Sequence, residues 1–134
     1  MADKQAITEL LNRAGVAYDT PDLDFLLNMF VDDGVFELVI TGNDPMIFEG
    51  RETINGLFEG SLEDQDDQRR HVVTNIFFQN ETETSATTVS YLTLITVKDG
   101  ALTVISSGVY TDDVVLVDGE WKLKKRHLLL DLPY

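Results

Sequence analysis

The spacing of apolar residues predicts three helices in the first half of the chain. From Asp3, which can cap a helix, to Gly15, apolar positions recur every three or four residues, as on one helix face. A second helix is expected after Thr20-Pro21, because threonine is a good N-cap and proline suits the first helical position. Asp32-Asp33-Gly34 is expected to end that helix. Residues 51–62 show the helical spacing again and predict a third helix.

Alternation of apolar and polar residues predicts a sheet in the rest of the chain. A strand over Val35–Ile40 and a short one over residues 46–50 precede the third helix. Asp99-Gly100 and Asp118-Gly119 are typical of tight hairpin turns and predict antiparallel neighbours. After an acidic loop, the alternation continues through four long strands, over residues 69–80, 84–97, 102–117 and 121–130.

This order of elements indicates an α+β fold, in which N-terminal helices pack on a curved, mostly antiparallel sheet. Gly108 lies in the middle of a predicted strand, where a bend or bulge would curl the sheet. A curled sheet covered by helices forms a cone-shaped α+β barrel, with a cavity suited to a small molecule. We expect one domain over residues 1–134, because a chain of this length supports one core.

Composition and charge narrow the range of functions. The chain has no cysteine, which excludes disulfides and thiolate metal sites, and with only two histidines we expect no metal and no cofactor. The formal net charge of −14 argues against binding to nucleic acid or to anionic membranes. No apolar run approaches the roughly 20 residues of a membrane helix. The N-terminal segment also lacks the apolar core of a signal peptide, so we expect a soluble, cytoplasmic protein.

The run RRHVVTNIFF, residues 69–78, places a histidine in an apolar strand. Because side chains alternate between the two faces of a strand, His71 and Asn75 are expected to share one face and the space beside it. Both faces are largely apolar, which predicts a central strand that is covered on both sides. A buried neutral histidine needs hydrogen-bond partners, and a carboxylate would fix its tautomer. Spacing alone does not identify that carboxylate, and a packed core histidine is the alternative.

Five segments follow one another along the chain: YDTPDLDFLLNMFVDDGVFEL, FEGRETINGLF, RRHVVTNIFF, SGVYTDDVVLVDG and GEWKLKKRHLL. Their order resembles that in the SnoaL-like branch of the nuclear transport factor 2-like superfamily. The resemblance covers nearly the whole chain, and the order and spacing of the motifs are typical of the fold, which hosts many functions.

The resemblance implies a catalytic pair. Scytalone dehydratase, bile-acid dehydratase and hexachlorocyclohexane dehydrochlorinase use a histidine and an aspartate, and the matching residues here are His71 and Asp19. The implied reaction is an elimination or isomerisation, in which His71 takes a proton from carbon and Asp19 stabilises the imidazolium. The chain would then be a cofactor-independent lyase or isomerase that acts on a hydrophobic, cyclic or aromatic small molecule.

The same resemblance suggests contacts to that substrate. Arg126 matches an arginine near the pocket of relatives, the alternative being an outward side chain that pairs with surface acids. The dehydratases carry a tyrosine five residues before the aspartate, where this chain has Ala14, and Tyr18 lies next to the aspartate instead. Tyr91 lies on the strand that carries a second acid or histidine in relatives. The candidates for substrate contact are Arg126, Asn75, Tyr18, Tyr91 and Tyr110. For Asn75 the alternative is a hydrogen bond that supports neighbouring backbone.

Other polar and aromatic residues are interpreted as structural. Trp121 follows a turn and is expected to pack against the core. His127 points to the face opposite Arg126 and is expected at the surface or in an interface. Asp112-Asp113 is expected to lie at the surface or in a turn.

Two other functions stay open. The chain could be a non-catalytic ligand-binding or assembly subunit, similar to the small β-subunits of aromatic-ring hydroxylating dioxygenases. It could also be an aldol catalyst of the polyketide cyclase type, with an acid in the same cavity. Members of the superfamily usually form dimers or trimers through the exposed sheet face, so we expect a homodimer or homotrimer.

Overall fold

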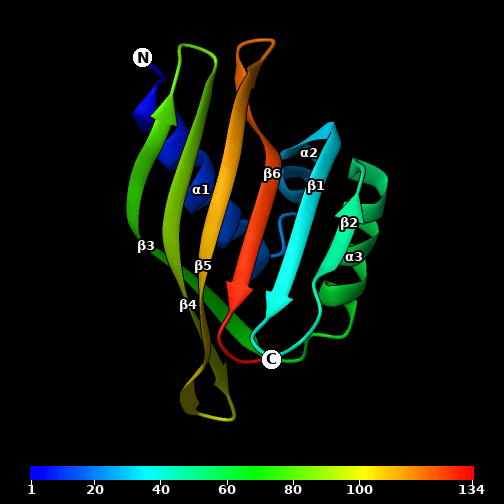
Figure 1. The fold of residues 1–134 in the computed structure, drawn as a ribbon. Helices are drawn as coiled ribbons and strands as arrows, with labels where there is room; N and C mark the ends of the chain where they lie inside the picture. The colour runs from blue at the N-terminus through cyan, green and yellow to red at the C-terminus, as the bar shows by residue number, and fades with distance from the viewer.

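A computed structural model describes all 134 residues and places three helices on one side of a six-stranded sheet (Figure 1). This arrangement confirms the predicted α+β fold. None of the helices has the length and apolar character needed to cross a bilayer. The elements are α1 (Lys4–Asp19), α2 (Leu23–Asn28), β1 (Phe30–Ile40), β2 (Met46–Glu49), α3 (Arg51–Glu63), β3 (Gln68–Glu81), β4 (Ser85–Lys98), β5 (Ala101–Val117) and β6 (Glu120–Leu130).

The strands lie in the order β2-β1-β6-β5-β4-β3, and the sheet curves around the helices without closing (Figure 1). Strands β1 and β6 are parallel, and every other neighbouring pair is antiparallel. Both predicted hairpin turns are present, because Asp99 and Asp118 each have a φ of 51° and are followed by a glycine with positive φ. The hairpins β4–β5 and β5–β6 therefore form the meander that the sequence predicts.

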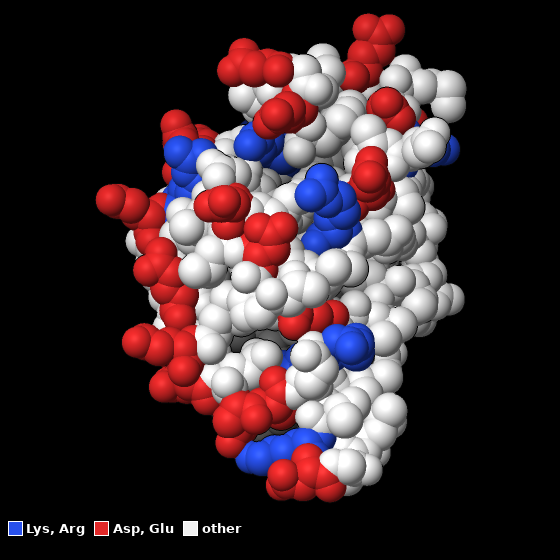
Figure 2. Space-filling model, turned by 180° about the vertical axis from the view of Figure 1, so that it is seen from behind, with Lys and Arg blue, Asp and Glu red and all other residues white.

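The hydrophobic core lies between the helices and the concave face of the sheet. The apolar stripe of α1 is buried against this face, as its spacing predicts, and includes Ile7, Leu11 and Ala14. Along β4 every second side chain is buried, from Ala86 to Thr96. The surface that the helices form, on the side of the molecule away from the outer face of the sheet, carries many scattered acidic side chains and fewer basic ones (Figure 2).

The second helix is shorter than the sequence predicts. Thr20 does not cap it but ends α1, with its backbone N–H and its hydroxyl both donating to the carbonyl of Val16. Asp22 caps α2 instead, accepting a hydrogen bond of 3.2 Å from the N–H of Phe25. The residues expected to end this helix, Asp32-Asp33-Gly34, lie inside β1, where the register with β6 shifts and the extra residues are accommodated as a bulge.

Strand β3 is an edge strand, so the prediction of a central strand covered on both faces is wrong. A bulge centred on Asn75, which has a φ of 57°, interrupts its pairing with β4. The bulge reverses the alternation, so that Ile76 and Phe78 turn toward the core while Phe77 is exposed. Odd-numbered residues such as His71 and Val73 therefore face inward before the bulge, and even-numbered residues such as Ile76 and Phe78 face inward after it. This change explains why both faces of the strand look apolar in the sequence.

Of the bend or bulge that the sequence predicts at Gly108, the bulge is not present. Gly108 pairs in register with Leu92 and Leu130. The pairing of β4 with β5 shifts at Leu94/Ile95 of β4, and that of β5 with β6 shifts at Asp113/Val114 of β5. A Cβ at Gly108 would lie 2.6 Å from the carbonyl oxygen of Leu129. The glycine therefore permits close approach of two backbones.

Candidate functional site

A partly enclosed cavity of about 110 Å³ lies between the concave face of the sheet, the end of α1 and α3. Nine of its thirteen lining residues are hydrophobic, which favours an apolar ligand. The lining consists of Tyr18, Phe36, Leu38, Leu57, Phe58, Ser61, Leu62, Gln65, Arg69, His71, Tyr110, Leu128 and Tyr134.

His71 and Asp19 are in direct contact at this cavity. The Nδ1 atom of His71 lies 2.7 Å from Oδ1 of Asp19, and the backbone N–H of His71 donates to Oδ2 of the same carboxylate at 2.9 Å. Both side chains are almost fully buried, with exposed fractions of 8% and 7%. Because a carboxylate only accepts hydrogen bonds, Nδ1 carries the proton and Nε2 remains as the nitrogen with a free lone pair.

A glycine in α1 explains how these two elements meet. Gly15 lies one helical turn before Asp19 and so on the same face of α1. A Cβ at Gly15 would lie 2.9 Å from the carbonyl oxygen of His71. Only a residue without a side chain lets α1 approach β3 this closely, and that approach brings the Asp19 carboxylate within reach of the imidazole.

Tyr18 covers the imidazole. Its ring is stacked on that of His71 with centroids 4.8 Å apart, and its edge meets Phe58 at 5.4 Å. Burial raises the pKa of the Tyr18 phenol to about 12, although the nearby Arg126 guanidinium opposes the shift. Tyr18 is therefore a neutral hydroxyl at the wall of the cavity, able to donate a hydrogen bond.

Arg126 lies behind the cavity rather than at its surface. Its Nε and Nη2 atoms donate to the two carboxylate oxygens of Asp112 at 2.8 and 3.1 Å, and its guanidinium lies 3.9 Å from the ring centroid of Tyr110. Burial alone would lower the pKa of Arg126, but the Asp112 carboxylate outweighs burial and raises it. The interpretation of Asp112 as a surface acid is wrong, since it is fully buried.

Two predicted site residues lie away from the cavity. Asn75 is exposed at the bulge of β3, so the expectation that it shares the space beside His71 is wrong. Tyr91 lies on the outer face of β4, between the buried Ser90 and Leu92, and is 51% exposed. Neither residue is placed to contact a molecule beside His71.

Arg69 and Tyr134 are among the lining residues that the sequence interpretation did not name. Arg69 precedes His71 by two positions, so strand alternation could have placed it on the same face. Tyr134 follows the last strand in a segment without periodicity, and no pattern in the sequence indicates that its ring lies 5.2 Å from the Arg69 guanidinium. Together these two side chains border the cavity.

The residues interpreted as structural behave as predicted in two cases. Trp121 is half-buried and packs against the core. His127 lies on the outer side of the sheet, with its Nε2 atom 3.3 Å from Oε1 of Glu37. Neither borders the cavity.

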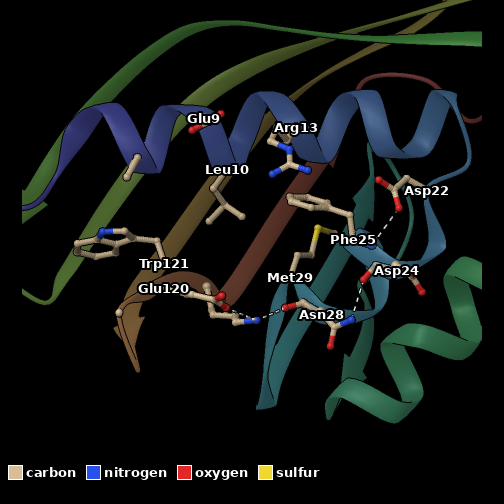
Figure 3. A pocket seen from close by; sticks show the side chains of 13 residues that line it. Glu9, Leu10, Arg13, Asp22, Asp24, Phe25, Asn28, Met29, Glu120 and Trp121 are labelled. Atoms are coloured by element: carbon tan, nitrogen blue, oxygen red, sulfur yellow. Dashed lines mark hydrogen bonds and ion pairs between the residues drawn. The ribbon is translucent and has the colours of Figure 1, made fainter.

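A larger groove of about 570 Å³ runs between α1, α2 and the β5–β6 turn (Figure 3). Its basic side chains are already engaged. Arg13 lies 4.7 Å from the ring centroid of Phe25, and Nζ of Lys122 lies 2.6 Å from the carbonyl oxygen of Asn28. The groove contains no histidine, and nowhere do three His, Asp or Glu side chains gather as metal ligands. The smaller cavity is therefore the candidate site, because it brings the His71–Asp19 pair to a partly enclosed apolar space.

Comparison with known proteins supports this fold over its full length. A solved structure of a protein of unknown function from Nostoc punctiforme, with a cystatin-like fold, is 30% identical; the match covers 98% of this chain and 94% of that one, with a TM-score of 0.79. A proposed scytalone dehydratase from Novosphingobium aromaticivorans is 27% identical over 96% of this chain and 83% of that one, with a TM-score of 0.77.

A third solved structure shares the fold alone. The β subunit of a proposed aromatic-ring-hydroxylating dioxygenase from Novosphingobium aromaticivorans has a TM-score of 0.84 at 17% identity, over 98% of this chain and 90% of that one. No curated protein sequence matches the chain. The family model of the SnoaL-like domain matches residues 1–127. The chain therefore belongs to the SnoaL-like domain family, within the nuclear transport factor 2-like superfamily.

Proposed function

We propose that this protein is a cofactor-independent lyase or isomerase that removes a proton from carbon in a small apolar molecule. The observation that carries the proposal is the 2.7 Å contact between Nδ1 of His71 and Asp19, which leaves Nε2 as the basic nitrogen at a partly enclosed apolar cavity. The proposed scytalone dehydratase among the similar structures supports the same class of reaction.

The proposed reaction begins with transfer of a carbon-bound proton to Nε2 of His71. The electron pair left on carbon is delocalised onto an adjacent carbonyl as an enolate, or expels a leaving group from the neighbouring carbon. Asp19 stabilises the imidazolium by charge, and the stacked face of Tyr18 does so by a cation–π contact. A positioned base of this kind accelerates a reaction by roughly 10²–10⁴-fold.

The size of the cavity limits the substrate. At about 110 Å³ it is smaller than the usual small-molecule pocket, which measures about 300–1,000 Å³. We therefore propose that the substrate is a single-ring ketone, enone or halide rather than a fused polycycle. The apolar lining, from Phe36 to Leu128, supports such a ligand.

Deuterium exchange into simple model compounds tests the proposal, whatever the natural substrate is. Cyclic ketones and enones are incubated in D₂O with the wild type, with His71→Gln and with His127→Gln, and carbon-bound deuterium is measured by NMR. The proposal predicts that wild type and His127→Gln accelerate exchange into at least one compound, and that His71→Gln does not. His127 is the matched control, since it is the second histidine of the chain and lies outside the cavity. Exchange that persists in His71→Gln, or that is absent in the wild type, would contradict the proposal.

We further propose that the chain assembles with a second copy of itself through the outer face of the sheet. The outward residues of β4, from Thr87 to Val97, carry no charge in a chain whose formal net charge is −14. Exposed apolar side chains on neighbouring strands extend this surface, among them Val72, Val104 and Leu129. The uncharged row of β4 lets two acidic copies meet there without opposing their charges.

A further inference from the structure

The lining of the cavity carries one permanent positive charge and no carboxylate. Nine of the thirteen lining residues are hydrophobic, and the other four are Ser61, Gln65, Arg69 and His71. All four belong to one stretch of chain, which runs from the end of α3 into β3 (Figure 1). No Asp or Glu lines the cavity, although the chain has 24 acidic residues. A cation among apolar side chains favours a ligand that has an anionic group on an apolar body.

Arg69 is held in place, but its terminal N–H groups are not used. Its Nε atom donates to Oδ1 of Asp67 at 3.0 Å, and its guanidinium lies 5.2 Å from the ring centroid of Tyr134. Nε is the only nitrogen of this guanidinium that donates to the protein, and Nη1 and Nη2 are not among the fully buried polar atoms without a partner. The side chain is 21% exposed, so water competes weakly for these donors. Because Asp67 takes one donor only, the terminal nitrogens remain available as a fork, which matches the two oxygens of a carboxylate.

Arg69 is also close to the proposed base. Arg69 and His71 are two residues apart on β3 and both line the cavity. Residues at this spacing on one face of a strand are about 7 Å apart. One six-membered ring bridges such a distance, so a molecule whose carboxylate binds Arg69 can place a ring carbon at Nε2 of His71.

We propose that Arg69 is a substrate-binding residue and that the substrate is a small cyclic carboxylic acid, whose carboxylate binds the terminal nitrogens of Arg69. The inference deepens the proposed function and rests on it, because the bound ring then presents its enolisable carbon to His71. The carboxylate undergoes no reaction in this scheme. It orients a ring that the apolar lining alone would hold in several ways.

Benzoate and nitrobenzene test the anionic contact, because their carboxylate and nitro groups have the same planar shape and differ in charge. Calorimetry gives the dissociation constants of both probes for the wild type, Arg69→Gln and Arg70→Gln. Arg70→Gln is the matched control: it removes the same charge from the adjacent position of β3, where the side chain is exposed and does not line the cavity.

The wild type is expected to bind benzoate about tenfold or more tightly than nitrobenzene. Arg69→Gln should weaken benzoate binding by about tenfold or more, the effect of losing hydrogen bonds between charged groups, and leave nitrobenzene binding unchanged. Arg70→Gln should change neither constant. Asp67→Asn should not weaken benzoate binding, because Arg69 keeps its charge and its terminal nitrogens. If Arg69→Gln does not fold, Arg69→Lys replaces it and should weaken binding of benzoate alone, since lysine lacks the fork.

Deuterium exchange gives a second readout. At equal concentrations below saturation, the wild type is expected to exchange 3-oxocyclohexanecarboxylate faster than cyclohexanone, and Arg69→Gln should remove that difference. Exchange that is insensitive to His71→Gln would contradict the proposed function instead. Benzoate binding needs no proton transfer and still reports on Arg69 in that case.

Four results would overturn the proposal. A wild type that shows no preference for benzoate has no anion site in the cavity. Equal losses of both probes in Arg69→Gln indicate a structural role, as does an equally large loss of benzoate binding in Asp67→Asn. A loss of benzoate binding in Arg70→Gln that matches the loss in Arg69→Gln indicates a general effect of charge.

Discussion

The Asp19 carboxylate holds His71 in two ways at once. It accepts from the imidazole and from the backbone N–H of the same residue, so ring and backbone are fixed to one anchor at the end of α1. A base held this way needs little reorganisation when the proton arrives. The pair is also nearly dry, which strengthens the electrostatic interaction between imidazolium and carboxylate.

Asp19→Asn tests this anchoring at the scale of one residue. An amide can donate to Nδ1, which favours the tautomer whose proton sits on Nε2, and that tautomer is not a base toward the cavity. We expect carbon–deuterium exchange to fall by about 10²-fold or more, while circular dichroism stays that of the wild type. Exchange at the wild-type rate in Asp19→Asn would show that the carboxylate does not set the tautomer.

The buried phenol of Tyr18 predicts a loss of stability at high pH. Its pKa is about 12 in the folded chain against an ordinary value of 10.0, so between these values the unfolded chain binds fewer protons than the folded chain. The stability due to this group is fully present below pH 10.0 and is lost as the pH rises toward 12. For one group the slope reaches about 1.4 kcal/mol per pH unit.

Urea unfolding measures this effect. The free energy of unfolding of Tyr18→Phe is expected to fall less steeply above pH 10.0 than that of the wild type. Tyr110, whose pKa burial also raises, contributes a slope that persists in the variant. Equal slopes in wild type and variant would mean that the Tyr18 phenol titrates in the folded state as it does in the unfolded chain.

At the scale of elements, the contact between α1 and β3 determines whether the site exists. Gly15 is the position where the two backbones are closest, and Asp19 reaches His71 only because of that approach. Glycine at position 15 lowers the stability of the helix relative to alanine, but it permits the backbone approach on which the geometry of the site depends. Gly108 likewise permits the close approach of the β5 and β6 backbones.

Gly15→Ala is expected to destabilise the fold by about 1–3 kcal/mol, because its Cβ would meet backbone that cannot yield without moving α1 from β3. Gly60→Ala in α3 is the matched control. No atom lies within 4 Å of a Cβ there, so alanine is expected to stabilise that helix by about 0.5–1 kcal/mol. Thermal and urea unfolding of both variants give the comparison. Equal effects of the two substitutions would show that α1 and β3 are not in tight contact.

The elements themselves could be predicted because their signals are local. Helical spacing, alternation and the Asp-Gly turns depend on a few neighbouring residues, and they identified three helices and the meander. The edge position of β3 depends on the pairing order of six strands, which no local pattern encodes. The bulge at Asn75 changes the phase of the strand without a glycine or proline to mark it. Alternation therefore assigned Asn75 to the wrong face.

The candidate site, too, could be predicted from the sequence only in part. Strand alternation and the family resemblance together pointed to His71 and Asp19, and the structure brings these two side chains into contact. Asp112 was misjudged because two adjacent acids usually mark a surface, whereas here Asp113 faces out and Asp112 pairs with Arg126 inside. Only the alignment of β5 with β6, which places Asp112 opposite Arg126, distinguishes the two acids.

At the scale of the whole molecule, many acidic side chains lie on the side formed by the helices, away from the uncharged outward row of β4 (Figure 2). A formal net charge of −14 keeps copies apart in most orientations, whereas an encounter through the outward row of β4 opposes no charges. This separation of charge and apolar surface is what makes the outer face the expected interface between copies.

Tyr91→Glu tests this interface, because it adds a charge in the middle of the uncharged outward row of β4, where the wild-type side chain is 51% exposed. Light scattering at micromolar concentration is expected to show a dimer or trimer for the wild type and a monomer for Tyr91→Glu. Val16→Glu is the control, since Val16 is a similarly exposed apolar residue on α1, away from the sheet. Added salt should strengthen wild-type assembly, since it screens the repulsion between acidic copies beyond about 10 Å while leaving apolar contact intact. A wild-type monomer, or assembly that Val16→Glu disrupts and Tyr91→Glu does not, would place the contact elsewhere or exclude it.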